Sequence, residues 1–215
     1  MADLALWHWS LHLTTAANST LLGNLAPVLV AVAAWRFLGE QLTRGFLAGL
    51  VLALLGAGLL VGRSLDFDRH LLRGDLLAVS TALFYAAYLL SVKVLRRRFS
   101  SATILAWSGL VSAPGFAVVA GLTGETLLPT GPGGWGILVA LALVCHVGGQ
   151  WLIGYGMGHL PASLSSLSLL IQPVVATLLA WPLLGEAIGP AQLAGGTAIL
   201  LGIAVAGGLV PWRRS

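Results

Sequence analysis

The chain has 215 residues, of which 58% are hydrophobic and only 8% are charged, and its formal net charge is +4. Soluble domains carry charge on roughly a quarter of their residues, so this composition excludes a soluble domain and predicts a polytopic membrane protein. The basic balance does not indicate nucleic-acid binding, because the Lys and Arg residues lie between apolar stretches, where they set orientation in the membrane.

Transmembrane helices need about 20 mostly apolar residues each. Residues 4–13 are apolar but provide only about half a span. Seven longer stretches follow in chain order: 15–36, 45–62, 76–95, 102–122, 135–158, 162–184 and 190–210. We therefore predict an all-α polytopic helix bundle with seven full transmembrane helices and a partial N-terminal one.

The first and sixth of these stretches carry the same pattern. Pro27, Trp35 and Leu38-Gly39-Glu40 return as Pro173, Trp181 and Leu184-Gly185-Glu186, and the offset is constant because 173 − 27 and 186 − 40 both give 146. The two copies are five helices apart, an odd number, so we expect them to be inverted in the membrane, as in alternating-access carriers. On the same offset, residues 4–13 match the end of a helix that begins near Trp135, so we expect the first copy to lack its N-terminal part.

Proline and the Gly-Glu pair each have a structural and a functional interpretation. Pro27 and Pro173 fall near mid-helix, where the missing N–H predicts a kink or an opening, either for packing or as a hinge. Glu40 and Glu186 follow a turn glycine (Gly39, Gly185), and we expect each to face the N-terminus of the next helix rather than to take part in transport. Glycines at small-xxx-small spacing, such as Gly45/Gly49 and Gly58/Gly62, predict close helix packing.

Polar side chains at mid-depth are the candidates for solute binding, because burying them in hydrocarbon is costly unless they face partners or water. The two copies do not share them: Asn24 aligns with Leu170, and Gln172 aligns with Ala26. His8 belongs to a Trp7-His8-Trp9 cluster that either anchors the interface or stacks on an aromatic solute. The predicted substrate-binding residues are His8, Asn24, Tyr85, His146, Gln150 and Gln172.

Catalytic and metal-binding patterns are absent from the sequence. We find no phosphate-binding loop, no metal-ligand cluster and no nucleophile–base pair at workable spacing, so we expect no cofactor, no metal and no enzymatic activity. The single cysteine, Cys145, rules out an intramolecular disulfide.

The doubled motif resembles the EamA-type members of the drug/metabolite transporter superfamily. The resemblance rests on Pro27, Gly39-Glu40 and Gly49 with Gly56, and on their counterparts Pro173, Gly185-Glu186, Gly195 and Gly202. It implies a carrier of two inverted five-helix halves that moves small metabolites, often outward. By that measure, residues 1–62 form an incomplete first EamA-like repeat and residues 76–210 form the second.

These observations predict a secondary transporter that exports small metabolites or drugs by alternating access. The alternative is a truncated, non-transporting membrane paralogue or assembly partner. Placing the Arg96-Arg97-Arg98 loop inside leaves eight of the eleven Lys and Arg residues on that side, which predicts a cytoplasmic C-terminus in a bacterial inner membrane. The expected partners are a small-molecule solute and the lipid bilayer, with no nucleic acid. Pairing into a homodimer is a further hypothesis for which the sequence offers no interface.

Overall fold

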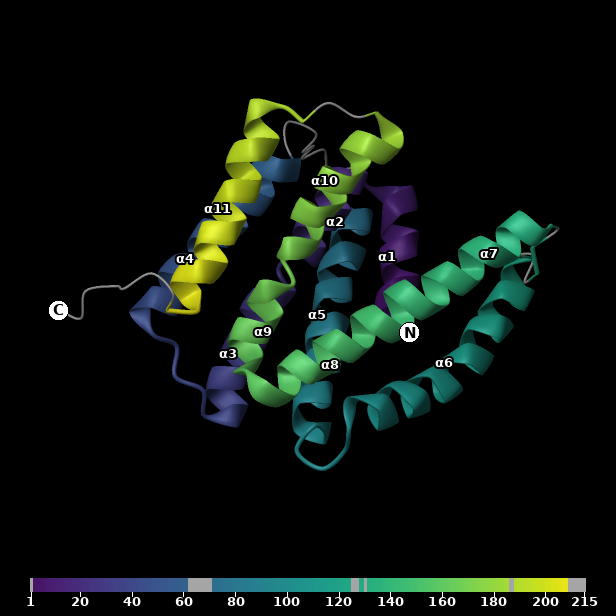
Figure 1. Ribbon diagram of the computed structural model, residues 1–215, viewed down its shortest axis with the longest axis horizontal. Helices are drawn as coiled ribbons and strands as arrows, with labels where there is room; N and C mark the ends of the chain where they lie inside the picture. The colour runs from purple at the N-terminus through teal and green to yellow at the C-terminus, as the bar shows by residue number, and fades with distance from the viewer. Residues whose placement is uncertain (1, 62–70, 125–127, 130, 186–187, 209–215) are drawn as a thin grey trace. The chain divides into compact units, whose positions relative to one another are not determined.

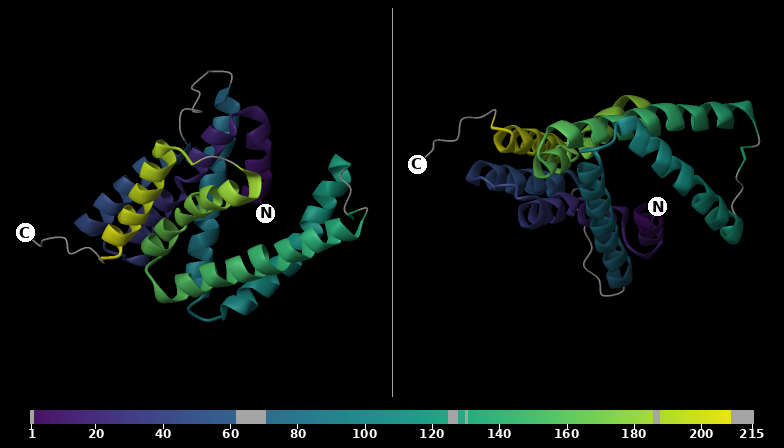
Figure 2. Two further views of the ribbon diagram at one scale, coloured as in Figure 1. Left: turned by 45° about the horizontal axis from the view of Figure 1, so that its top comes forward. Right: turned by 90° about the horizontal axis from the view of Figure 1, so that it is seen from below.

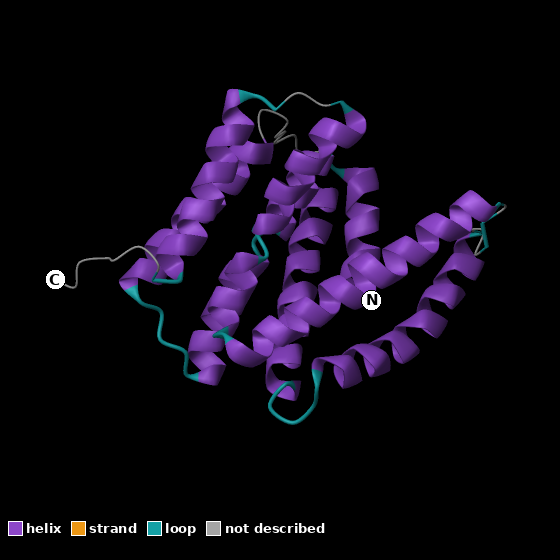
Figure 3. Cartoon of the chain, viewed as in Figure 1, coloured by secondary structure: helices purple, strands orange, loops and turns teal. Residues whose placement is uncertain are grey.

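A computed structural model of the chain describes residues 2–61, 71–124, 128–129, 131–185 and 188–208. Within these residues the regular structure is entirely helical (Figure 3). The chain divides into a large unit, residues 2–90 with 161–208, and a small unit, residues 91–160. An all-α membrane fold is therefore confirmed.

The large unit contains both copies of the doubled motif. Its helices are α1 (Ala2–Leu13), α2 (Ala16–Gly23), α3 (Ala26–Leu38), α4 (Arg44–Val61), most of α5 (Leu72–Leu95), α9 (Ala162–Ser168), α10 (Ile171–Leu184) and α11 (Pro190–Ala206). α1 is the half-length segment expected at the N-terminus. The core of the unit lies where α4 and α11 meet α3, α9 and α10, and it includes Phe46, Leu50, Leu167 and Ile199.

The small unit holds the last turn of α5 together with α6 (Ser101–Thr123), α7 (Pro132–Ala140), a π-helical segment η3 (Leu141–Gly149) and α8 (Gln150–His159). Basic side chains in the last turn of α5 and just after it bond to carbonyls of α8 and of the residue that follows it. Arg96 Nε donates to the Gly154 carbonyl at 2.9 Å, and Lys93 Nζ donates to the Leu160 carbonyl at 2.5 Å. Both place positive charge at a helix C-terminus, where the helix dipole favours it.

Glycines allow α4 and α11 to pack with their backbones almost in contact (Figures 1 and 2). A Cβ added at Gly56 would lie 2.6 Å from the Gly195 carbonyl oxygen, and one added at Gly202 would lie 2.6 Å from the Gly49 carbonyl oxygen. Early positions of α4 therefore face late positions of α11, so the two helices are antiparallel. Gly56 packs on Gly195, which is the repeat counterpart of Gly49, and Gly49 packs on Gly202, which is the repeat counterpart of Gly56. Such reciprocal contacts are the pattern of a two-fold axis.

The repeat offset of 146 residues appears in the helix boundaries themselves. α9 begins 146 residues after α2, α10 ends 146 after α3, and α11 begins 146 after α4. The pair α2–α3 runs in the opposite direction to α9–α10 (Figure 1). The fold therefore contains an inverted repeat, as the parity of the intervening helices predicted.

Among the residues that the structure describes, six segments are long and apolar enough to cross a membrane: Asn18–Leu38, Arg44–Val61, Leu72–Leu95, Ser101–Leu122, Pro132–His159 and Ala162–Leu183. The seventh predicted span corresponds to α11, which is apolar but has only 17 residues. The number of seven full spans stays a prediction.

Candidate functional site

The two repeated helices are both interrupted at the position where the prolines predicted an opening. α2 ends at Gly23, and α3 begins at Ala26 with Pro27 in its first turn. Leu25 N–H bonds back to the Leu22 carbonyl at 3.1 Å, three residues away instead of four. Because Pro27 has no N–H, the Gly23 carbonyl cannot receive its usual helical hydrogen bond.

Asn24 lies in this interruption and supplies a second unsatisfied group. Its backbone N–H bonds to the Thr20 carbonyl at 3.0 Å, but its side-chain amide nitrogen is buried and has no hydrogen-bond partner among the described residues. A buried donor without a partner costs about 1–3 kcal/mol. Such a group is retained where a solute or water can satisfy it, which favours the solute-binding interpretation of Asn24.

The second interruption lies between α9 and α10. Leu169 and Leu170 separate the two helices, and Leu170 N–H bonds to the Leu167 carbonyl at 3.0 Å. Gln172 lies in the first turn of α10 with an exposed side chain. The hydroxyl oxygen of Ser165, on α9, is buried and has no hydrogen-bond partner in the part of the chain that the structure describes. Each break is thus accompanied by a buried polar atom that no described residue satisfies.

Glu40 contacts a helix N-terminus, but not the one that the sequence suggested. Its carboxylate accepts hydrogen bonds from Ala162 N–H at 2.5 Å, Ser163 N–H at 3.0 Å and Ser163 Oγ at 2.7 Å. These donors begin α9, 122 residues away in the chain. The following helix, α4, is capped instead by Thr43, whose hydroxyl accepts from Phe46 N–H at 3.1 Å. Glu40 therefore ties the first copy to the interrupted helix of the second.

The glycines of the Leu-Gly-Glu motifs end their helices in the left-handed conformation. Gly39 has φ = 73° at the end of α3, and Gly185 has φ = 71° at the end of α10. This conformation favours glycine because it has no Cβ. Glu186 lies outside the described residues.

Aromatic candidates occur on two helices of the large unit. The rings of Tyr85 and Tyr88, on α5, are stacked with centroids 6.2 Å apart. His8 and His12, on α1, have ring nitrogens 3.4 Å apart and both are exposed. Tyr85 and Tyr88 are both half-buried.

His146 and Gln150 belong to the small unit. Residues 141–149 form a π-helix instead of the continuous α-helix that the sequence predicted. π-Helical segments occur frequently at functional sites. His146 is exposed and Gln150 is half-buried, and the Gln150 N–H bonds back to the His146 carbonyl.

The structure places Asn24, Tyr85, Gln172 and His8 in the large unit and His146 with Gln150 in the small one. That all six contact one solute stays a prediction. Sequence reasoning missed Ser163, which binds Glu40, and Ser165. The signal that could have indicated them is the Ser-rich run at residues 163–168, just before Pro173.

Inverted repeats with interrupted helices are common in a class of integral membrane proteins, the membrane transporters. This chain belongs to the EamA-like transporter family, whose pattern it matches over residues 2–62 and 72–208.

Three proteins of Bacillus subtilis strain 168 are similar to the chain at 26% identity. The uncharacterized transporter YyaM aligns with 96% of this chain and 69% of its own length. For the uncharacterized transporters YetK and YwfM, the alignments cover 80% and 84% of this chain but only 54% and 60% of the relatives. The chain thus spans between about half and two thirds of these proteins.

A crystal structure, described only as that of a protein, superposes on the chain with a TM-score of 0.81. The sequence identity is 22%, and the match covers 97% of this chain and 74% of the other. This similarity concerns the fold alone.

Proposed function

We propose that the protein is a secondary carrier that exports a small, largely apolar or zwitterionic metabolite from the bacterial cytoplasm by alternating access. The observation that carries the proposal is the buried, unpartnered Asn24 amide at the break between α2 and α3. A solute with a carbonyl or carboxylate oxygen would satisfy this donor. The Gly23 carbonyl, which lacks its usual helical donor because Pro27 has no N–H, would accept from an amine or hydroxyl of the same solute.

The two breaks support a hinge role for Pro27 and Pro173. They lie at matching positions of oppositely oriented helices, so bending at one and straightening at the other would exchange the open side. Glu40 supports the same interpretation, because its three hydrogen bonds hold α9 against the end of α3 at one side of the bundle. Release of these bonds would open that side. The Arg96-Arg97-Arg98 loop favours a cytoplasmic C-terminus.

The experiment begins with overexpression in bacteria and a resistance screen against toxic metabolite analogues. The solute that emerges is then measured in reconstituted vesicles. Asn24→Leu and Gln172→Ala each install the residue that the other repeat carries at that position, so membrane insertion should be retained. We expect both variants to lose transport, whereas Gln41→Leu, in the exposed turn after Gly39, should transport normally.

Equal flux in all three variants would remove Asn24 and Gln172 from the solute site. No flux in the unaltered protein, with insertion intact, would favour the alternative of a membrane paralogue that does not transport.

A further inference from the structure

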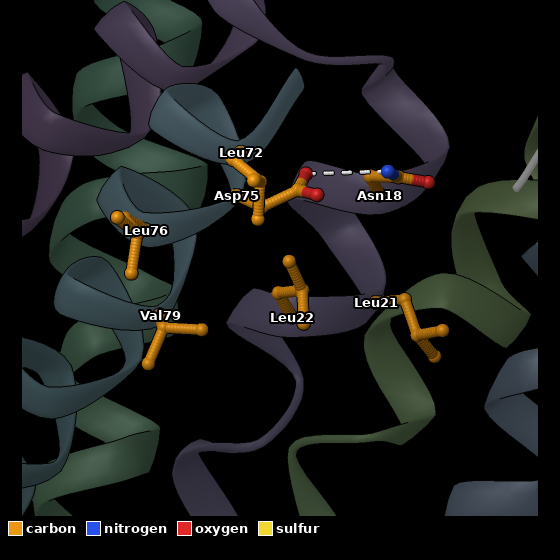
Figure 4. A pocket seen from close by; sticks show the side chains of 7 residues that line it. All are labelled: Asn18, Leu21, Leu22, Leu72, Asp75, Leu76 and Val79. Carbon is orange, nitrogen blue, oxygen red and sulfur yellow. Dashed lines mark hydrogen bonds between the residues drawn. The ribbon is translucent and has the colours of Figure 1, made fainter. Parts of the chain in front are cut away.

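A pocket of about 180 Å³ lies between α2 and α5 in the large unit (Figure 4). The two helices contribute residues at helical spacing, so each presents one face to the cavity. The lining residues are Asn18, Leu21, Leu22, Leu72, Asp75, Leu76 and Val79. Five apolar side chains thus surround a single amide and a single carboxylate.

The carboxylate of Asp75 is held in place by two buried neighbours. One of its oxygens, Oδ1, accepts from Thr14 Oγ1 at 2.6 Å and from Asn18 Nδ2 at 3.2 Å. Thr14 and Asn18 are 7% and 3% exposed. Gly74 brings α5 so close to the turn after α1 that an added Cβ would lie 2.6 Å from the Thr14 nitrogen. Asp75 is therefore fixed before any ligand arrives.

The negative charge of Asp75 has no cationic partner within the part of the chain that the structure describes. Arg73 is two positions away on α5, and residues at that spacing do not face each other on a helix. A carboxylate has about four acceptor positions, and the two donors to Oδ1 leave Oδ2 able to accept more. Asp75 lies in the first turn of α5, where the helix dipole favours its charge. A carboxylate with no cationic partner among the described residues, set against apolar walls, favours a ligand that is both cationic and apolar.

We propose that this pocket binds a small primary-amine cation with an apolar body. The ammonium group donates to Asp75 Oδ2, and the body packs against Leu22, Leu76 and Val79. The size fits, since an apolar cavity of about 150 Å³ accommodates benzene. A metal ion would find only one carboxylate and one amide here. The pocket is separate from the helix breaks, so the proposal does not require that the chain transports its ligand.

The test measures binding of 2-phenylethylammonium to the purified protein in lipid nanodiscs by calorimetry, with empty nanodiscs as the blank. We expect saturable binding of the amine, and binding of 2-phenylethanol, which has the same body without the charge, at least about tenfold weaker. Asp75→Asn should weaken amine binding by a similar factor, while Oδ1 still accepts from Thr14 and Asn18.

Two further variants separate the pocket from general effects. Val79→Phe fills the cavity with the carboxylate intact and should abolish binding, whereas Leu83→Phe, one turn further along α5 and outside the lining, should leave it unchanged. Thermal unfolding of each variant verifies its fold. Equal affinity for amine and alcohol, or unchanged amine binding in folded Asp75→Asn or Val79→Phe, would overturn the proposal. The assay measures amine binding and not transport, so its outcome does not depend on whether the protein transports a solute.

Discussion

The contact between α4 and α11 gives the sharpest test of the fold, through the substitution Gly56→Ala. The added Cβ would lie 2.6 Å from the Gly195 carbonyl oxygen and 2.8 Å from the Ile199 nitrogen, whereas ordinary contacts begin at 3.4 Å. Both neighbours are backbone atoms and cannot rotate away. The helices must therefore separate locally by 3.4 − 2.6, or about 0.8 Å.

That separation affects the whole seam, because a gap of this size forfeits roughly a quarter to a half of each dispersion contact. Overpacking of a tight interface costs about 1–3 kcal/mol. We expect Gly56→Ala to lower the free energy of unfolding by that amount, measured as loss of helical circular dichroism during titration with SDS. Gly58→Ala is the matched control on the same helix, since an added Cβ there meets nothing within 4 Å. It should be neutral or stabilising by about 0.5–1 kcal/mol.

Gly195→Ala should behave like Gly56→Ala, and the double variant should cost less than the sum, because one separation relieves both contacts. If Gly56→Ala and Gly58→Ala have the same stability, or the double variant is strictly additive, the close antiparallel contact of α4 and α11 is refuted.

Two more substitutions test contacts at the ends of the helices. Glu40→Ala removes the acceptor of three donors at the start of α9 and should lower the free energy of unfolding by about 1–3 kcal/mol. Gln41→Ala is the control and should change it by nearly zero in the same SDS titration. Equal effects of the two substitutions would show that the carboxylate does not hold α9. Gly74→Ala puts a Cβ 2.6 Å from the Thr14 nitrogen and should destabilise by about 1–3 kcal/mol. Gly109→Ala is the control and should not destabilise the protein, because its added Cβ has open space around it. A thermal melting scan that finds both variants unchanged would contradict the close approach of α5 to the α1–α2 turn.

Much of the fold follows from the sequence because the lipid bilayer is a demanding solvent. Long apolar stretches must form helices to satisfy their backbone groups, so the spans could be located from composition. Pro27 and Pro173 lack an N–H wherever they occur, so an opening in each helix could be predicted. The parity of the intervening helices was enough to predict the inversion.

The partners of individual side chains could not be predicted in this way. Gly56 and Gly58 look equally suited to packing in the sequence, yet only Gly56 lies against α11. Glu40 was assigned to its neighbouring helix, but its acceptor oxygens bind α9, because the repeats fold against each other. Nothing in the sequence around His146 predicted the π-helical segment.

Composition, periodicity and the 146-residue offset determined by themselves that this is a helical membrane protein with two oppositely directed copies of one unit, since burial in lipid and covalent backbone chemistry act on each segment locally. Only the tertiary structure decided which glycine, carboxylate and hydroxyl meet, because such contacts depend on how segments far apart in the chain approach each other. The pocket around Asp75 also depends on the tertiary structure. The sequence shows only that Asp75 lies near a helix end, whereas the approach of α2 to α5 makes its carboxylate part of a pocket wall.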